Sequence, residues 1–89
     1  MSTSKLIRSA AAIADDHEWE LLAVRPAHDQ PANDYLGFVL CRRNITANPH
    51  YPYCTHLLNV SVTEGPGYFA IGHYDMDLDT AIEDFCTRK

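Results

Sequence analysis

The chain has 89 residues, with 12 acidic and 7 basic side chains and a formal net charge of -5. A chain of this length forms one domain, here residues 1–89, which buries about 60–65% of the surface exposed by the unfolded chain. The acidic balance argues against direct nucleic-acid binding, because proteins that hold a phosphate backbone carry a basic stripe. It favours a protein partner with a basic surface.

Apolar runs and cysteine usage predict the compartment. No stretch approaches the ~18 apolar residues that span a bilayer, and no segment resembles a signal peptide. The three cysteines are an odd number at irregular spacing, which does not suit a disulfide framework. We therefore expect a cytoplasmic protein that has no contact with membranes and keeps its thiols reduced.

The hydrophobic pattern predicts a helix, four strands and a second helix, in that order. The first helix covers about Lys5 to Ala14, is capped by Ser4, and buries Leu6, Ile7, Ala10, Ile13 and Ala14. The four strands are expected at Trp19–Arg25, Tyr35–Arg43, Tyr53–Val62 and Tyr68–Tyr74. The second helix carries one apolar stripe, formed by Leu78, Ala81, Ile82 and Phe85.

These elements predict an α+β domain. The connections between strands are too short for parallel crossovers, so the four-stranded sheet should be an antiparallel meander. We expect the N-terminal and C-terminal helices to be packed on one face of this sheet. The inward residues of the third and fourth strands are then His56, Leu58, Val60, Val62, Phe69 and Ile71, and the solvated face displays Thr55, Asn59 and Ser61.

Acidic residues surround the apolar stripe of the last helix. Asp75, Asp77 and Asp79 resemble the opening of a calcium-binding loop. The match fails later, because Thr80 and Cys86 stand where that loop needs glycine and glutamate. We predict instead that Asp77 caps the helix. The carboxylates expected to meet a basic partner are Asp77, Asp79, Glu83 and Asp84.

An aromatic segment, His50-Tyr51-Pro52-Tyr53, precedes the third strand. Tyrosines are favoured at recognition surfaces because they bury much area at a low entropic cost. Tyr51 and Tyr53 are therefore candidate partner-binding residues, with packing of the loop onto its own sheet as the alternative.

A second hypothesis is a small metal- or thiol-dependent enzyme. Cys54 and His56 lie two residues apart on one strand and so share a face. If His73 falls opposite Leu58, it approaches this pair together with Asp75. Such a cluster would hold zinc or activate a thiolate. No compact ligand pair, phosphate loop or nucleophile motif accompanies it, so the preferred prediction contains no catalytic residue, metal or cofactor.

The segment from Gly72 to Phe85 resembles the ends of small uncharacterised proteins from phages and mobile elements, in which a strand ending in Gly-His-Tyr leads into a helix with an acidic-Phe pair. Val39-Leu40-Cys41-Arg42-Arg43-Asn44 also fits a strand of that type. The resemblance covers about a third of the chain. It implies an inhibitor of host machinery, such as an anti-CRISPR or anti-restriction protein, and assigns no functional residue.

Together these observations predict a non-enzymatic protein-binding module. Its acidic helix would occlude a basic surface of a nucleic-acid-handling complex. The alternatives are the enzyme built on Cys54, His56 and His73, and a structural subunit of a homo-oligomer such as a homodimer.

Overall fold

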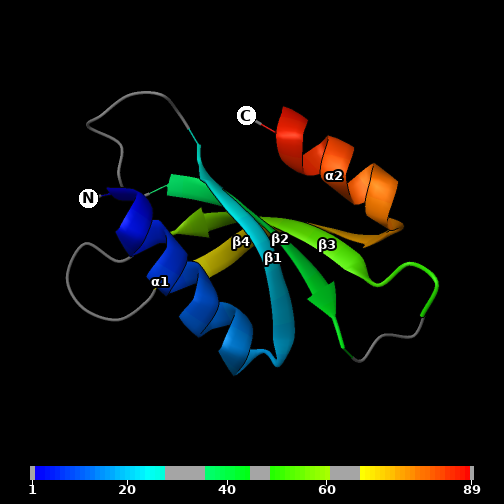
Figure 1. Cartoon of the computed structure of the whole chain (residues 1–89), viewed down its shortest axis with the longest axis horizontal. Coiled ribbons are helices and arrows are strands. Elements are labelled where there is room, and N and C mark those ends of the chain that lie inside the picture. The colour runs from blue at the N-terminus through cyan, green and yellow to red at the C-terminus, as the bar shows by residue number, and fades with distance from the viewer. Residues whose placement is uncertain (1, 28–35, 45–48, 61–66, 89) are drawn as a thin grey trace.

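A computed structural model describes residues 2–27, 36–44, 49–60 and 67–88 of the chain. Helix α1 (Ser2–Asp16) is followed by four strands and by helix α2 (Leu78–Thr87), as Figure 1 shows. The strands are β1 (Trp19–Pro26), β2 (Leu36–Arg43), β3 (Tyr53–Asn59) and β4 (Tyr68–Met76). Within these ranges, neither helix has the length and apolarity that crossing a membrane requires.

The strands form one sheet in the order β1-β2-β3-β4, and every neighbouring pair is antiparallel. The predicted α+β class and the four-stranded meander with helices at both ends are therefore confirmed. Helix α1 extends beyond its predicted bounds at both ends, and β4 continues to Met76. The predicted strand residues Tyr35, Ser61 and Val62 lie outside the described residues.

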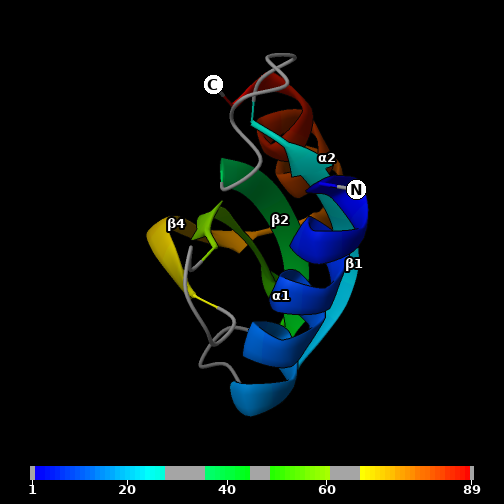
Figure 2. The same ribbon diagram turned by 90° about the vertical axis from the view of Figure 1, so that its left-hand side faces the viewer.

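The two helices lie on opposite faces of the sheet, so the expectation that they share one face is wrong. The α1-side core consists of Leu6, Ala10, Ile13, Ala14, Val39, Cys41, Cys54, Leu58 and Val60. The α2-side core consists of Phe38, Leu40, Ala81 and Phe85. Residues of β2 alternate between the two cores, which places α1 and α2 on either side of the strands (Figures 1 and 2).

The physical reason lies in β2, whose residues from Gly37 to Cys41 are all buried. A strand with a continuous apolar run is typically covered on both faces, whereas a half-solvated strand alternates. Gly37 permits the close approach of both β1 and α1, because a Cβ at this position would lie 2.7 Å from the carbonyl oxygen of Arg25 in β1 and 3.3 Å from Leu6 Cδ2 in α1.

The predicted solvated face is consequently covered where α2 crosses it. Thr55 is fully buried there, and Asn59 is only partly exposed. Ile7 of α1, expected inside, is exposed instead. The side of the helix that packs on the sheet carries Leu6, Ala10 and Ile13. Ile7 therefore lies on the side that faces solvent.

Strand β4 pairs irregularly with β3. The register shifts twice along this pair, and Ile71 and Asp75 adopt the left-handed backbone conformation, with φ of 46° and 59°. Phe69 packs against the α1-side core as predicted. Ile71, predicted to face the same core, is 68% exposed, because the irregular backbone breaks the alternation on which that prediction rests.

Candidate functional site

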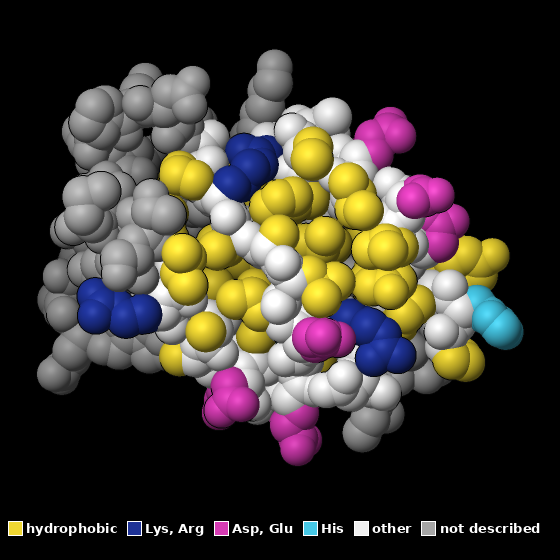
Figure 3. All heavy atoms as spheres, in the orientation of Figure 1, with side chains coloured by type: hydrophobic (Ala, Val, Ile, Leu, Met, Phe, Trp, Pro, Cys, Tyr) yellow, Lys and Arg dark blue, Asp and Glu magenta, His cyan; other side chains and the backbone are white. Residues whose placement is uncertain are grey.

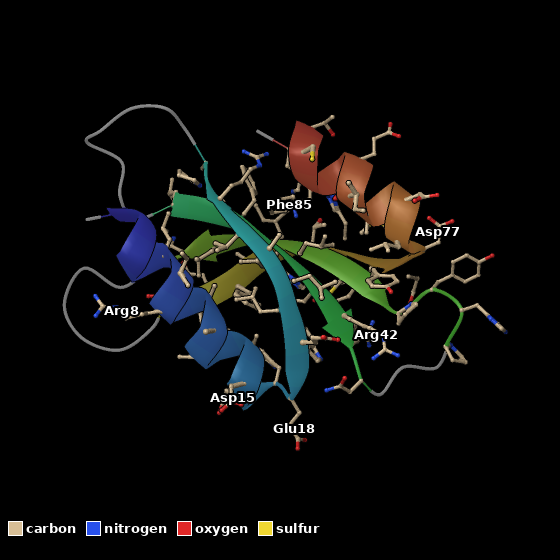
Figure 4. The ribbon with its side chains drawn as sticks, viewed as in Figure 1. Arg8, Asp15, Glu18, Arg42, Asp77 and Phe85 are labelled. Atoms are coloured by element: carbon tan, nitrogen blue, oxygen red, sulfur yellow. The ribbon has the colours of Figure 1, made fainter. Side chains whose placement is uncertain are left out.

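Helix α2 presents an outer face that is both apolar and acidic. Ala81 and Phe85 bury the inner side, and Phe85 points toward the strands in Figure 4. Leu78 and Ile82, predicted to lie in the same buried stripe, are 40% and 43% exposed. They recur at four-residue spacing with the exposed Cys86, beside the exposed acids Asp79 and Glu83. Half of the predicted apolar stripe therefore faces solvent.

Asp77 begins α2 as predicted. Its side chain accepts a hydrogen bond of 2.8 Å from the backbone N–H of Thr80, the usual geometry of an N-cap. Hydrogen bonds from Thr80 lower the pKa of the Asp77 carboxyl below its usual value. The carboxylate therefore stabilises the helix start while it remains exposed to a partner.

Asp84 is not the free surface carboxylate that its sequence position suggested. It accepts a hydrogen bond from the hydroxyl of Thr55, and its Oδ2 lies 2.9 Å from His73 Nδ1. Burial alone would raise the pKa of Asp84, but the hydrogen bonds from Thr55 and His73 outweigh it and hold the pKa below its usual value. Asp84 faces the sheet because it stands next to Phe85 on the inner side of α2.

Two arginines hold the C-terminal end of α2 against the sheet. Arg25 donates to the carbonyl oxygen of Phe85 at 2.8 and 3.0 Å and to that of Arg88 at 2.6 Å. Arg88 donates to Thr55 Oγ1 at 3.1 Å and to the carbonyl oxygen of Ile71 at 2.6 Å. Both guanidinium groups lie over the ring of Phe38. Arg25 thereby satisfies carbonyls at the end of α2 that would otherwise lack partners, and Arg88 ties the same end to β3 and β4.

The tyrosine segment lies at the same end of the molecule as the start of α2. Tyr53 pairs with Met76, two residues before α2 begins, and packs partly buried against the α2-side core. Tyr51 is exposed. In the orientation of Figure 1, acidic side chains gather at this end beside apolar ones (Figure 3). The structure therefore assigns Tyr53 mainly to packing and leaves Tyr51 exposed in the segment before β3.

The predicted convergence of Cys54, His56, His73 and Asp75 is wrong. His73 pairs with Thr55 rather than with Leu58, because the irregularities of β4 shift the register. Cys54 and His56 therefore face α1, whereas His73 reaches Asp84 of α2 through the opposite face. Asp75 approaches Arg43 at 3.9 Å. In the ranges that the structure describes, no group of three or more His, Cys, Asp or Glu side chains could hold a metal ion.

The thiols of the α1-side core are poorly suited to nucleophilic chemistry. Cys54 lies directly opposite Cys41, and both are fully buried free thiols. Burial raises the pKa of Cys41 to about 12 and that of Cys54 to about 11. Both thiols are protonated at neutral pH, whereas a nucleophile or a metal ligand must be a thiolate.

Sequence reasoning missed a cluster of aromatic rings at the end of α1. His17 stacks on Trp19 at 4.6 Å between ring centroids, and His56 stacks between Trp19 and Phe69 at 5.5 and 5.3 Å. His56 shares a hydrogen bond of 2.7 Å with the hydroxyl of Tyr74. The spacing of these residues gives no direct signal, because they come from the turn after α1 and from the strands β1, β3 and β4, and they meet only through the strand register.

His56 is neutral in this cluster. The residue is 3% exposed, and burial, followed by the positive charge of Arg88, lowers the pKa of its imidazole to about 4. Gly72 makes room for the ring, since a Cβ at that position would overlap both His56 and Tyr74. This neutral, enclosed imidazole packs between aromatic rings and is shielded from any substrate in solution.

Comparison of the chain with protein-family models, curated proteins and solved structures finds no significant match.

Proposed function

We propose that this chain is a non-enzymatic protein-binding module that acts in the cytoplasm and docks through the outer face of α2 onto a basic surface of a partner protein. The observation that carries the proposal is the exposure of Leu78 and Ile82 beside Asp79 and Glu83 on one side of the helix. These four residues are called the α2 docking face below.

The composition of the α2 docking face suits an interface. Two aliphatic side chains supply apolar area that binding removes from water, and each Å² so buried contributes a favourable free energy of about 25 cal/mol. Among the described residues, no ion pair engages Asp79 or Glu83, so both charges remain available to lysines and arginines of a partner. Complementary charges of this kind increase the association rate and select the partner.

The inner side of α2 is built to hold the helix in place while its outer side binds. Arg25, Arg88 and Asp84 are engaged with the sheet or with the helix end, and Phe85 is buried. A docking helix that is already ordered avoids the entropic cost of folding on binding. An inhibitory role follows if the basic surface of the partner normally holds nucleic acid, which the docked module would then occlude.

The exposed thiol of Cys86 provides a direct test. A photo-reactive cross-linker attached to Cys86 should capture the partner in a lysate of the native host, and the captured protein is then purified for binding measurements. The variant Asp79→Lys with Glu83→Lys should associate more slowly, with the greatest loss at low salt. The matched control, Asp15→Lys with Glu18→Lys, changes the same net charge at exposed positions away from α2.

Equal affinity of the double α2 variant and the control across a salt titration would overturn the proposal. The homo-oligomer alternative has its own outcome in the same experiment, namely cross-links between two copies of the chain and a sedimentation coefficient that rises with concentration. Either result would contradict the binding of a basic partner by α2.

A further inference from the structure

A groove on the α1 side of the molecule lies away from the α2 docking face. It has a volume of about 470 Å³ and runs between the last two turns of α1 and the beginning of β4. Within the part of the chain that the structure describes, the groove is lined by Ala12, Ile13, Asp16, His17, Gly67, Tyr68 and Phe69. Its size falls within the range of small-ligand sites, which is roughly 300–1,000 Å³.

Aromatic rings that are held from behind form much of the groove wall. His17 is stacked on Trp19 and lies 6.2 Å from Phe69 between centroids, and both rings belong to the aromatic cluster around His56. Tyr68 is 57% exposed, and its hydroxyl accepts a hydrogen bond of 3.2 Å from Asn59 Nδ2. A ligand entering the groove therefore meets rings whose orientation is already set.

The electrostatics of the groove favour a positive charge. Asp16 is the last residue of α1, where the helix dipole contributes partial negative charge, and the last turn of α1 contains no basic residue. Asp15 and Glu18 lie beside it and are exposed. Aromatic faces attract cations as well, through the negative potential above the ring.

We propose that this groove binds a guanidinium group. A guanidinium is planar, so it stacks on the exposed ring of Tyr68. Its N–H groups then donate to the Asp16 carboxylate in the bidentate geometry that carboxylates accept. A compact ammonium would satisfy the charge but not the stacking. The group has two sources, a small guanidinium compound or an arginine side chain of a protein, and the chemistry of recognition is the same for both.

The test is a titration followed by amide and indole NMR signals. The probes are N-acetyl-arginine amide and its neutral isostere N-acetyl-citrulline amide, and the reporters are Gly67, Phe69 and the Trp19 indole. The arginine probe should shift these signals saturably at millimolar concentration, and the citrulline probe should not. Equal shifts with both probes, or none with either, would overturn the proposal.

Two variants assign the binding to the groove. Asp16→Asn should weaken binding of the arginine probe about two- to fivefold, the value of one exposed ion pair, and Tyr68→Leu should weaken it by a similar factor through loss of the ring face. Both positions are exposed, so the amide spectrum should otherwise stay unchanged. Asp79→Asn removes the same charge from α2 and should leave the affinity unaltered. An effect of Asp79→Asn equal to that of Asp16→Asn would mean nonspecific attraction to an acidic protein and would overturn the site.

The source of the guanidinium follows from a third probe, the peptide acetyl-Gly-Arg-Gly-amide. Tighter binding of the peptide than of N-acetyl-arginine amide indicates an arginine presented by a protein, and weaker binding indicates a small molecule. Both outcomes support the guanidinium site, which is independent of the α2 docking face, because the titration contains no partner protein.

Discussion

The two faces of the sheet are stabilised by different kinds of interaction. On the α1 side, helix and strands join through apolar side chains, two buried thiols and a stack of aromatic rings. On the α2 side, a small apolar core centred on Phe85 is surrounded by Arg25, Asp84 and Arg88. A short helix with few buried residues can thus be held by charged groups on its inner side, which leaves Leu78 and Ile82 on its outer side exposed.

The largest expected effect concerns the α2-side core. Phe85→Ala should lower the free energy of unfolding by about 3–5 kcal/mol, because it removes the main apolar contact of α2. Urea unfolding followed by the fluorescence of Trp19, the single tryptophan, reports the α1 side, and far-UV circular dichroism reports both helices. Leu78→Ala on the outer face is the control and should change stability by about 0.5 kcal/mol or less. Equal effects of the two variants would show that Phe85 does not anchor the helix.

The second-largest expected effect is a pH dependence of stability that differs between the two faces of the sheet. His56 has a usual pKa of 6.5 and a folded pKa of about 4, so between these values the unfolded chain binds more protons than the folded chain. Stability should therefore fall as the pH drops from 6.5 to 4, by about 3 kcal/mol in total. The depressed pKa of Asp84 adds a separate loss on the α2 side, which begins only below the usual value of 3.8.

Substitution distinguishes these two losses. His56→Gln removes the titrating group, so the stability of this variant should change little between pH 6.5 and 4, as measured by urea unfolding at several pH values. The exposed His50→Gln serves as the control and should keep the wild-type slope. An unchanged slope in His56→Gln would mean that another group causes the acid sensitivity.

A smaller effect is expected from the arginine that holds the end of α2. Arg25→Met should cost about 1.5–3 kcal/mol, because it leaves carbonyl groups of Phe85 and Arg88 without their charged donor. The exposed Arg8, which points away from α1 in Figure 4, provides the control Arg8→Met. Thermal unfolding of both variants measures the difference. A loss of less than about 0.5 kcal/mol in Arg25→Met, the size of an ordinary surface substitution, would place Arg25 among the dispensable surface charges.

The smallest perturbation uses the thiols as reporters of each face. Cys86 is exposed on α2, whereas Cys41 and Cys54 are buried with raised pKa values. A thiol-reactive chromophore should modify one cysteine per native chain rapidly, with almost no change in stability, and the other two only after unfolding. Rapid reaction of all three thiols in the native protein would show that the α1-side core opens readily.

Local pattern alone sufficed for much of the fold. The helical spacing of Ala81 and Phe85 and the cap at Asp77 follow from residue-by-residue preferences, and the structure agrees with them. The short connections likewise determined the antiparallel order of the strands. The unbroken apolar run of β2 also indicates that both faces of the sheet are covered. The alternating pattern of β3 had favoured one solvated face instead.

Which of these residues come together depends on the packing of the elements against one another. The register shifts of β4 accompany positive φ values at Ile71 and Asp75, which the conformational preferences of these residues do not predict. The shifts separate His73 from His56. The position of α2 on the second face turns Asp84 inward and Leu78 and Ile82 outward. Periodicity specifies which residues share one side of an element, but packing against a particular neighbour decides which side is buried.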